Sequence, residues 1–117
     1  MELTYKSEEH KNQCNQILQK LGLITVNQNK ELGSFAYIAS ATYKTRYLLP
    51  ALRSNGSIDV EMYYDVIEPF SSSEKAMLKF AIQCFNDSIS DITIPAVFRS
   101  LDSENTFAVK QAINIRY

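Results

Sequence analysis

The sequence predicts a mainly α-helical domain, because apolar residues recur at spacings of three and four in several separate stretches and helix-capping residues stand at their ends. Glycine and proline are scarce, with three residues of each, which disfavours a loop-rich fold. The 117 residues have the length of one domain. We therefore expect residues 1–117 to form a compact single-domain bundle of four to five helices.

The stretch from Ser71 to Asn86 predicts the clearest helix. Ser71 and Glu74 have the spacing of a capping box, in which each side chain satisfies a free backbone N–H of the first turn. We expect Asn86 to end the helix in the left-handed conformation that asparagine tolerates. The apolar stripe consists of Ala76, Met77, Phe80, Ala81, Cys84 and Phe85.

Three further helices are predicted from the same kind of pattern. The first runs from Ser7 to Leu21, with Ser7 as its N-cap. The second runs from about Asn29 to Ala41, although Gly33 inside it costs about 1 kcal/mol relative to alanine. The last runs from Ser103 to about Arg116, and Asp102 is its expected N-cap.

Two regions leave the structure open. From Tyr43 to Arg53 the pattern is helical, but Pro50 predicts a helix that is short, kinked or restarted at the proline. From Ile58 to Val66 apolar and polar residues alternate, as in a half-buried strand, and Asn55-Gly56 ahead of them favours a turn. A strand here would need a partner. The alternative to a mainly α fold is therefore an α+β fold with a two- or three-stranded element.

Composition and charge disfavour several classes of function. The net charge of −1 gives no overall field that would hold nucleic acid, which disfavours a general nucleic-acid binder. No apolar run approaches the roughly 20 residues that span a bilayer, and we expect no membrane association. Cys14 and Cys84 both lie among apolar residues, and nothing near Met1 has the pattern of a secretory signal. We expect buried thiols and a cytoplasmic protein.

Candidate chemistry is sparse. The single histidine, His10, lies four residues before Cys14, so the two side chains would be neighbours on one helix face. No third group in the local sequence would orient the imidazole, and we expect an exposed His10 beside a buried Cys14. The spacing of cysteines, histidine and glycines fits neither a zinc site nor a phosphate-binding loop. We thus expect no catalytic residue, no metal and no cofactor, with a small enzyme that uses His10 as an alternative.

Two segments are candidates for binding a partner. One interleaves aromatic and cationic residues from Tyr43 to Tyr47 and continues to Arg53. The other, Ile58 to Phe70, is acidic and aromatic and contains no basic residue. Tyrosine and arginine anchor many protein interfaces, and an acidic surface complements a basic groove. The expected binding residues are Tyr43, Lys44, Arg46, Tyr47 and Arg53 in the first segment, and Asp59, Glu61, Tyr63, Tyr64 and Asp65 in the second.

These features favour a non-enzymatic protein that acts through protein–protein interaction, as a monomer or a homodimer. The partner's identity is left open. Because stacked aromatics and cations also bind single-stranded nucleic acid, a small nucleic-acid module that uses Tyr43 to Arg53 is an alternative.

Three motifs occur along the chain. The first is the run Glu8-Glu9-His10-Lys11, and the second consists of Ser72, Met77, Phe80-Ala81 and Phe85-Asn86. The third is Leu101-Asp102 with Ala112-Ile113-Asn114-Ile115-Arg116-Tyr117. Together these motifs resemble a family of small uncharacterised proteins of Firmicutes and their phages and mobile elements. The resemblance implies a largely helical domain without an established activity, cofactor or catalytic residue. The phage context implies an inhibitor that binds and blocks a bacterial defence system, as anti-CRISPR proteins do.

Overall fold

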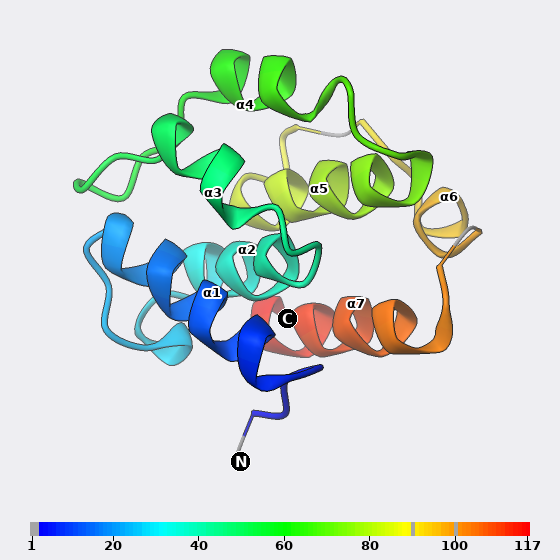
Figure 1. Ribbon diagram of the computed structural model, residues 1–117, viewed down its shortest axis with the longest axis horizontal. Coiled ribbons are helices and arrows are strands. Elements are labelled where there is room, and N and C mark those ends of the chain that lie inside the picture. Colours follow the sequence, from blue (N-terminus) through cyan, green and yellow to red (C-terminus); the bar gives the residue numbers. More distant parts are fainter. Residues whose placement is uncertain (1–2, 90, 100) are drawn as a thin grey trace.

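Helices form almost all of the regular structure in the computed structural model, which describes residues 3–89, 91–99 and 101–117 (Figure 1). The mainly α prediction is confirmed. The α-helices are α1 (Glu8–Lys20), α2 (Lys30–Ser40), α3 (Thr45–Leu48), α4 (Val60–Ile67), α5 (Ser72–Phe85), α6 (Ile94–Phe98) and α7 (Ser103–Arg116), and the two 3-10 turns are η1 (Val26–Gln28) and η2 (Leu49–Ala51).

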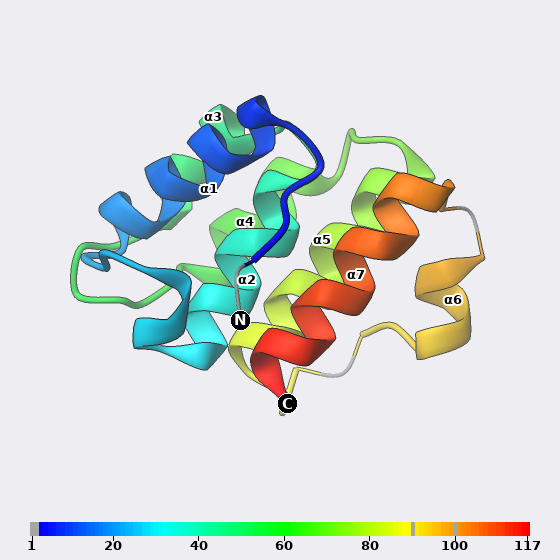
Figure 2. The same cartoon turned by 90° about the horizontal axis from the view of Figure 1, so that it is seen from below.

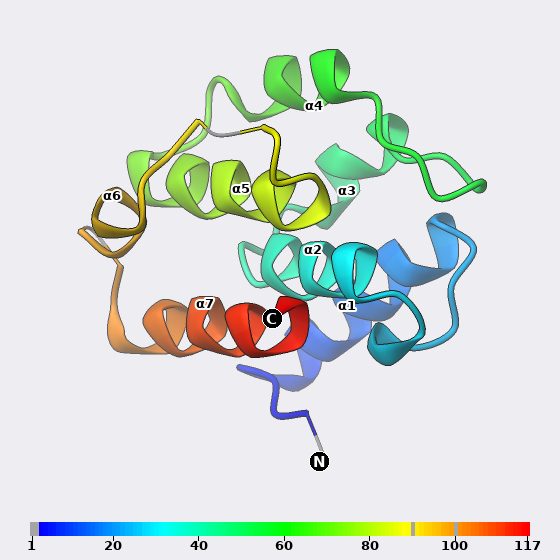
Figure 3. The same ribbon diagram turned by 180° about the vertical axis from the view of Figure 1, so that it is seen from behind.

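Helix α2 is the centre of the bundle. Every residue from Leu32 to Ser40 is buried, and α2 contacts α1, α5, α7 and η1. In Figures 1 and 3, α4 lies above α5, and α7 lies below α2. Figure 2 shows α1 and α7 on either side of α2. The core is therefore arranged around a helix that has no solvent-facing side over most of its length.

The predicted N-caps Ser7, Ser71 and Asp102 are present, and Asn29, where the second helix is expected to begin, is also an N-cap. The side chains of Ser7, Asn29 and Asp102 accept hydrogen bonds from backbone N–H groups in the first turns of α1, α2 and α7. Ser71 and Glu74 form the predicted capping box of α5. These caps explain why the boundaries of four helices follow from local sequence.

The predicted ending of α5 is wrong in its geometry. Asn86 follows the last helical residue, as expected, but its φ of −148° is extended and not left-handed. Its side chain instead accepts hydrogen bonds from the backbone N–H and the hydroxyl of Ser88. The asparagine thus ends the helix by starting a turn that its side chain stabilises.

The strand alternative for Ile58 to Val66 is wrong, because these residues lead into and form most of α4. Asp59 caps this helix by accepting a hydrogen bond from the backbone N–H of Met62. Tyr63 and Ile67, four residues apart, are its buried residues. The buried side chains thus have the spacing of a helix, although the apolar and polar residues of the segment alternate as in a strand.

The turn predicted at Asn55-Gly56 is confirmed. Gly56 has a φ of +84°, a conformation that favours glycine, and the backbone N–H of Arg53 donates to the carbonyl of Ser57 across the turn. An isolated antiparallel bridge joins Leu52 to Ile58. Among the residues that the structure describes, this bridge is all that exists of the two- or three-stranded element.

None of the described helices combines the length and the apolar character needed to cross a bilayer.

Candidate interaction surface

The segment from Tyr43 to Arg53 is built as a broken helix, as the proline predicts. Helix α3 comprises only Thr45–Leu48, and η2 continues it through Pro50. Leu48 and Ala51 are buried against the rest of the bundle. Thr45 and Leu52 are also buried, Lys44 and Leu49 are half-buried, and the exposed side chains of the segment are those of Tyr43, Arg46, Tyr47, Pro50 and Arg53.

Tyr43 has a strained backbone. Its φ is +60°, and it is the only non-glycine residue with a positive φ among those that the structure describes. This region costs a bulky L-residue about 1–2 kcal/mol. The residue is nevertheless 41 % exposed. Its ring lies 4.5 Å from the Lys6 ammonium, and its hydroxyl shares a hydrogen bond of 2.8 Å with that of Ser7.

Thr45 shows a second local departure from ordinary structure. Its hydroxyl oxygen is buried and has no hydrogen-bond partner within the part of the chain that the structure describes. Its backbone N–H donates to the side chain of Gln13 on α1 at 3.4 Å. Buried polar groups are almost always satisfied, so α3 begins with an unfavourable arrangement next to the strained Tyr43.

Arg46, Tyr47 and Lys44 form a cationic and aromatic cluster on α3. A guanidinium nitrogen of Arg46 donates to the hydroxyl of Tyr47 at 2.6 Å, and the guanidinium carbon lies 4.7 Å from the ring centroid. This hydrogen bond and the nearby positive charge lower the pKa of Tyr47. Lys44 lies 5.4 Å from the ring of Phe70 and 3.9 Å from a carboxylate oxygen of Glu74.

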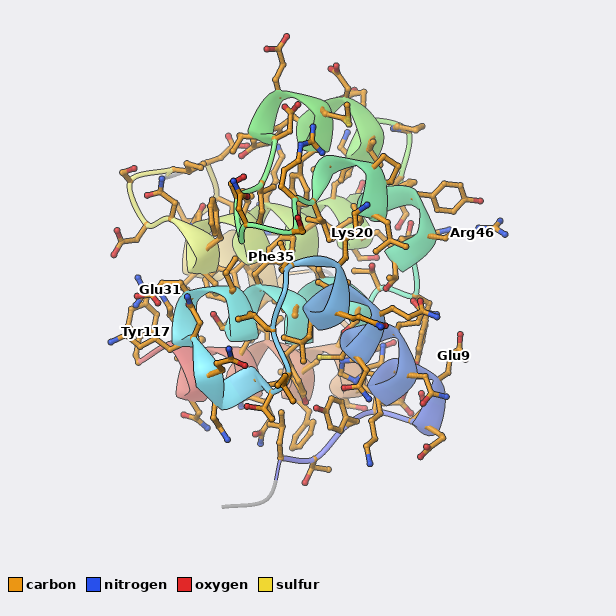
Figure 4. The ribbon with its side chains drawn as sticks, turned by 90° about the vertical axis from the view of Figure 1, so that its left-hand side faces the viewer. Glu9, Lys20, Glu31, Phe35, Arg46 and Tyr117 are labelled. Atoms are coloured by element: carbon orange, nitrogen blue, oxygen red, sulfur yellow. The ribbon has the colours of Figure 1, made fainter. Side chains whose placement is uncertain are left out.

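A groove of about 240 Å³ separates α1 from the start of α3. Figure 4 shows the side chains of Glu9 and Arg46 extending from the same side of the molecule. Neither forms an ion pair with any residue in the described ranges. We call this feature the α1–α3 groove, and its lining consists of Glu9, Gln13, Gln16, Tyr43 and Arg46.

Arg53 and Asp59, which the sequence assigned to two different binding segments, pair with each other. A guanidinium nitrogen of Arg53 lies 3.3 Å from a carboxylate oxygen of Asp59. Arg53 also donates to the carbonyl of Pro50 at 2.6 Å, and Asp59 caps α4. Both residues have structural roles that leave them less available to a partner.

The acidic segment presents a narrower surface than predicted. Glu61, Met62 and Asp65 are exposed and, with Asp59, line a shallow hollow of about 250 Å³ on the outer side of α4. We call Glu61, Met62 and Asp65 the α4 acidic face.

The tyrosines of α4 do not belong to this face. The prediction that Tyr63 lies on the binding surface is wrong: it is fully buried, and its hydroxyl donates to the carbonyl of Leu78. Its ring packs 5.7 Å from that of Phe35. Tyr64 is half-buried on the side of Asp91, and burial together with the Asp91 charge raises its pKa. The alternation of apolar and polar residues indicated a strand, but the segment is a helix. In the helix the two tyrosine rings lie apart from the exposed carboxylates.

His10 is buried, contrary to the prediction that it is exposed. Its Nε2 lies 2.8 Å from the carbonyl of Tyr37, and its Nδ1 accepts a hydrogen bond of 3.0 Å from the backbone N–H of Lys6. This arrangement fixes the neutral tautomer with the hydrogen on Nε2. Because both ring nitrogens are engaged with backbone groups, neither is available to take a proton from a substrate in this conformation.

The two cysteines are buried free thiols, as predicted. Burial raises the pKa of Cys14 to about 11, and that of Cys84 to about 11. Both sulfurs are therefore protonated at neutral pH and lack thiolate character. No group of three or more residues with metal-ligating side chains occurs among the described residues.

Comparisons of the chain with protein-family models, with curated proteins and with solved structures found no match.

Proposed function

We propose that the protein is a non-enzymatic binding protein that engages other proteins through the α1–α3 groove and the α4 acidic face. The observation that carries the proposal is Tyr43, whose backbone is strained while its ring is exposed. Beyond its contacts with Lys6 and Ser7, the residue keeps surface that is open to a partner. Departures from local preference of this kind cluster at functional sites.

The residue types of the groove support the same proposal. Tyrosine and arginine are the side chains that most often supply binding energy at protein interfaces, because they combine contact area with hydrogen-bonding groups. Tyr43, Arg46 and Tyr47 are exposed together beside the groove.

The α4 acidic face adds a second observation. Glu61 and Asp65 lie at i and i+4 on one helix, where like charges repel by about 0.2–0.5 kcal/mol. Neither has an ion-pair partner among the described residues. With the apolar Met62 between them, they complement a basic partner surface that has an apolar centre.

The nucleic-acid alternative has less support. Of the three cations in its segment, Lys44 is near Glu74 and Arg53 pairs with Asp59, which leaves Arg46 as the one with no ion-pair partner in the part of the chain that the structure describes. The narrower expectation, that the partner is a bacterial defence enzyme, rests on the family resemblance and stays a prediction.

The test is site-specific photo-crosslinking in a bacterial host. A photoreactive amino acid is placed at Tyr47 beside the groove, at Met62 on the α4 acidic face, and at Lys110 on α7 as a control position. A reproducible crosslink to one particular protein from Tyr47 or from Met62, together with no crosslink from Lys110, supports the proposal. At Met62 the crosslink should disappear when Glu61→Lys and Asp65→Lys are combined. An absence of specific crosslinks at both surfaces contradicts it.

A further inference from the structure

The α1–α3 groove carries two opposite charges, on Glu9 and Arg46, that form no ion pair with each other. Glu9 accepts a hydrogen bond of 2.6 Å from the side-chain amide of Gln13, and Arg46 donates to Tyr47 at 2.6 Å. Both charged groups line the groove, and they project on the same side of the molecule (Figure 4). The groove thus presents one negative and one positive side chain to a bound partner.

This pattern is self-complementary. In a two-fold dimer every contact occurs twice: when residue i of one copy contacts residue j of the other, residue j of the first copy also contacts residue i of the second. A surface with one acid and one base can then form two equivalent ion pairs. Gln13 and Gln16 fit the same arrangement, because a carboxamide both donates and accepts hydrogen bonds.

We propose that a second copy of this chain occupies the α1–α3 groove, with Arg46 of each copy paired with Glu9 of the partner subunit. The inference rests on the proposed function, since it names the partner of that same surface. Tyr43, which lines the groove, and Tyr47, which is exposed beside it, are the aromatic anchors of this interface. Loss of solvent around the Arg46 charge strengthens the new ion pairs relative to exposed ones.

Charge favours a second copy over a strongly charged partner at this surface. A basic partner would be attracted by Glu9 and repelled by Arg46, and an acidic partner the reverse, whereas a second copy satisfies both. The α4 acidic face has the opposite property, because Glu61 and Asp65 would repel the same residues of another copy. Dimerisation through the groove therefore leaves the α4 acidic face to a different, basic protein.

A dimer of this kind would cover part of the exposed surface around the groove. A standard-size interface covers roughly 800 Å² of each partner, and the chain exposes 6201 Å² in total. The two tyrosine anchors are 41 % and 43 % exposed, so each has area to bury. Aromatic anchors surrounded by polar groups are typical of interface centres.

The test is sedimentation velocity of the full chain over low to high micromolar concentrations. The wild-type protein should shift with concentration from 13.3 kDa toward twice this mass. Glu9→Arg and Arg46→Glu should each weaken dimerisation by at least about tenfold, because each places like charges together. The double variant, which exchanges the two charges, should restore it. Lys110→Glu on α7, a charge reversal at an exposed position away from both surfaces, is the matched control and should leave the dimer unchanged.

Circular dichroism of each variant establishes that it is folded before its mass is compared. A wild-type chain that remains at the monomer mass throughout overturns the inference, as does a double variant that is no tighter than either single variant. If the chain is monomeric and Tyr47 still crosslinks to a different protein, the proposed function stands and the dimer does not. If the chain dimerises and neither surface crosslinks to another protein, the dimer stands and the wider proposed function does not.

Discussion

The imidazole of His10 on α1 is held between two backbone groups, the carbonyl of Tyr37 on α2 and the N–H of Lys6 in the N-terminal segment. The side chain has no solvent exposure. Burial lowers the pKa of His10 from 6.5 to about 4, and the nearby Lys6 ammonium acts in the same direction. The histidine therefore fastens the N-terminal segment to the bundle as a neutral group.

This arrangement predicts that the protein loses stability in mild acid. Between the ordinary pKa of 6.5 and the folded-state pKa of about 4, the unfolded chain binds a proton at His10 that the folded chain does not. The free energy of unfolding should therefore fall as the pH decreases through this window, by up to about 3 kcal/mol from this residue. Urea unfolding at pH 7, 5.5 and 4 measures the change.

His10→Gln is the control for this pH dependence. Glutamine retains a donor and an acceptor but does not titrate, so the variant should be less stable than the wild type at pH 7 and should lose less stability between pH 7 and 4. The same loss in both proteins would show that other groups cause the acid sensitivity.

At Tyr43, the glycine variant should be more stable than the alanine variant, which reverses the order of stability usually found for these two residues. Both substitutions remove the ring and its contacts with Lys6 and Ser7, but only glycine relieves the positive φ. We expect Tyr43→Gly to be more stable than Tyr43→Ala by about 1 kcal/mol. At Lys110, which is exposed in α7, alanine should be the more stable by about 1 kcal/mol. Thermal unfolding of the four variants gives both differences, and the same order at the two sites would contradict strain at Tyr43.

Gly33 should not tolerate alanine, although it lies within a helix. A Cβ at this position would collide with the carbonyl oxygen of Val26 in η1, and the two backbone segments would have to move apart. The steric cost outweighs the gain of about 1 kcal/mol in helix propensity, and we expect Gly33→Ala to destabilise the protein by about 1–3 kcal/mol. Chemical denaturation measures this, and a variant as stable as the wild type would refute the close contact.

Arg116 should contribute more to stability than an ordinary surface arginine. Its Nε donates to the carbonyl of Cys84 at 2.8 Å, and its guanidinium nitrogens lie 3.5 Å from Asp87 and 3.9 Å from Glu31. It thereby joins the end of α7 to α5 and α2. We expect Arg116→Ala to cost about 2 kcal/mol. Arg99→Ala, at an exposed position, should cost less than about 0.5 kcal/mol, and equal effects of the two would argue against this role.

Local signals account for the parts of the fold that the sequence predicts correctly. Ser7, Asn29, Ser71 and Asp102 each cap a helix by contacts within three residues, so a short window contains the whole interaction. The error in α4 has a local cause as well. The alternating pattern ends at Val66, one residue before Ile67. Ile67 lies four residues after the buried Tyr63, and this pair has the spacing of a helix. Helix α6 has only five residues, too few to show a period.

The features missed at the candidate site depend on distant parts of the chain. His10 is buried because Tyr37, which is 27 residues away, and the N-terminal segment close around it. Tyr63 leaves the surface because its hydroxyl reaches the carbonyl of Leu78 in α5. Neither contact has a signature in the neighbouring sequence. The positive φ of Tyr43 was also unpredictable, because that conformation normally selects glycine or asparagine.

The enclosure of α2 determines how the molecule opens. Because α2 is covered by α1, α5 and α7, its amide hydrogens cannot reach solvent while these helices remain packed. Hydrogen exchange at Phe35 to Ser40 should thus require global unfolding and report the full unfolding free energy. Amides of α6, a five-residue helix at the edge of the bundle, should exchange through smaller openings. The protein should therefore come apart from its periphery, with the central helix the last to be released.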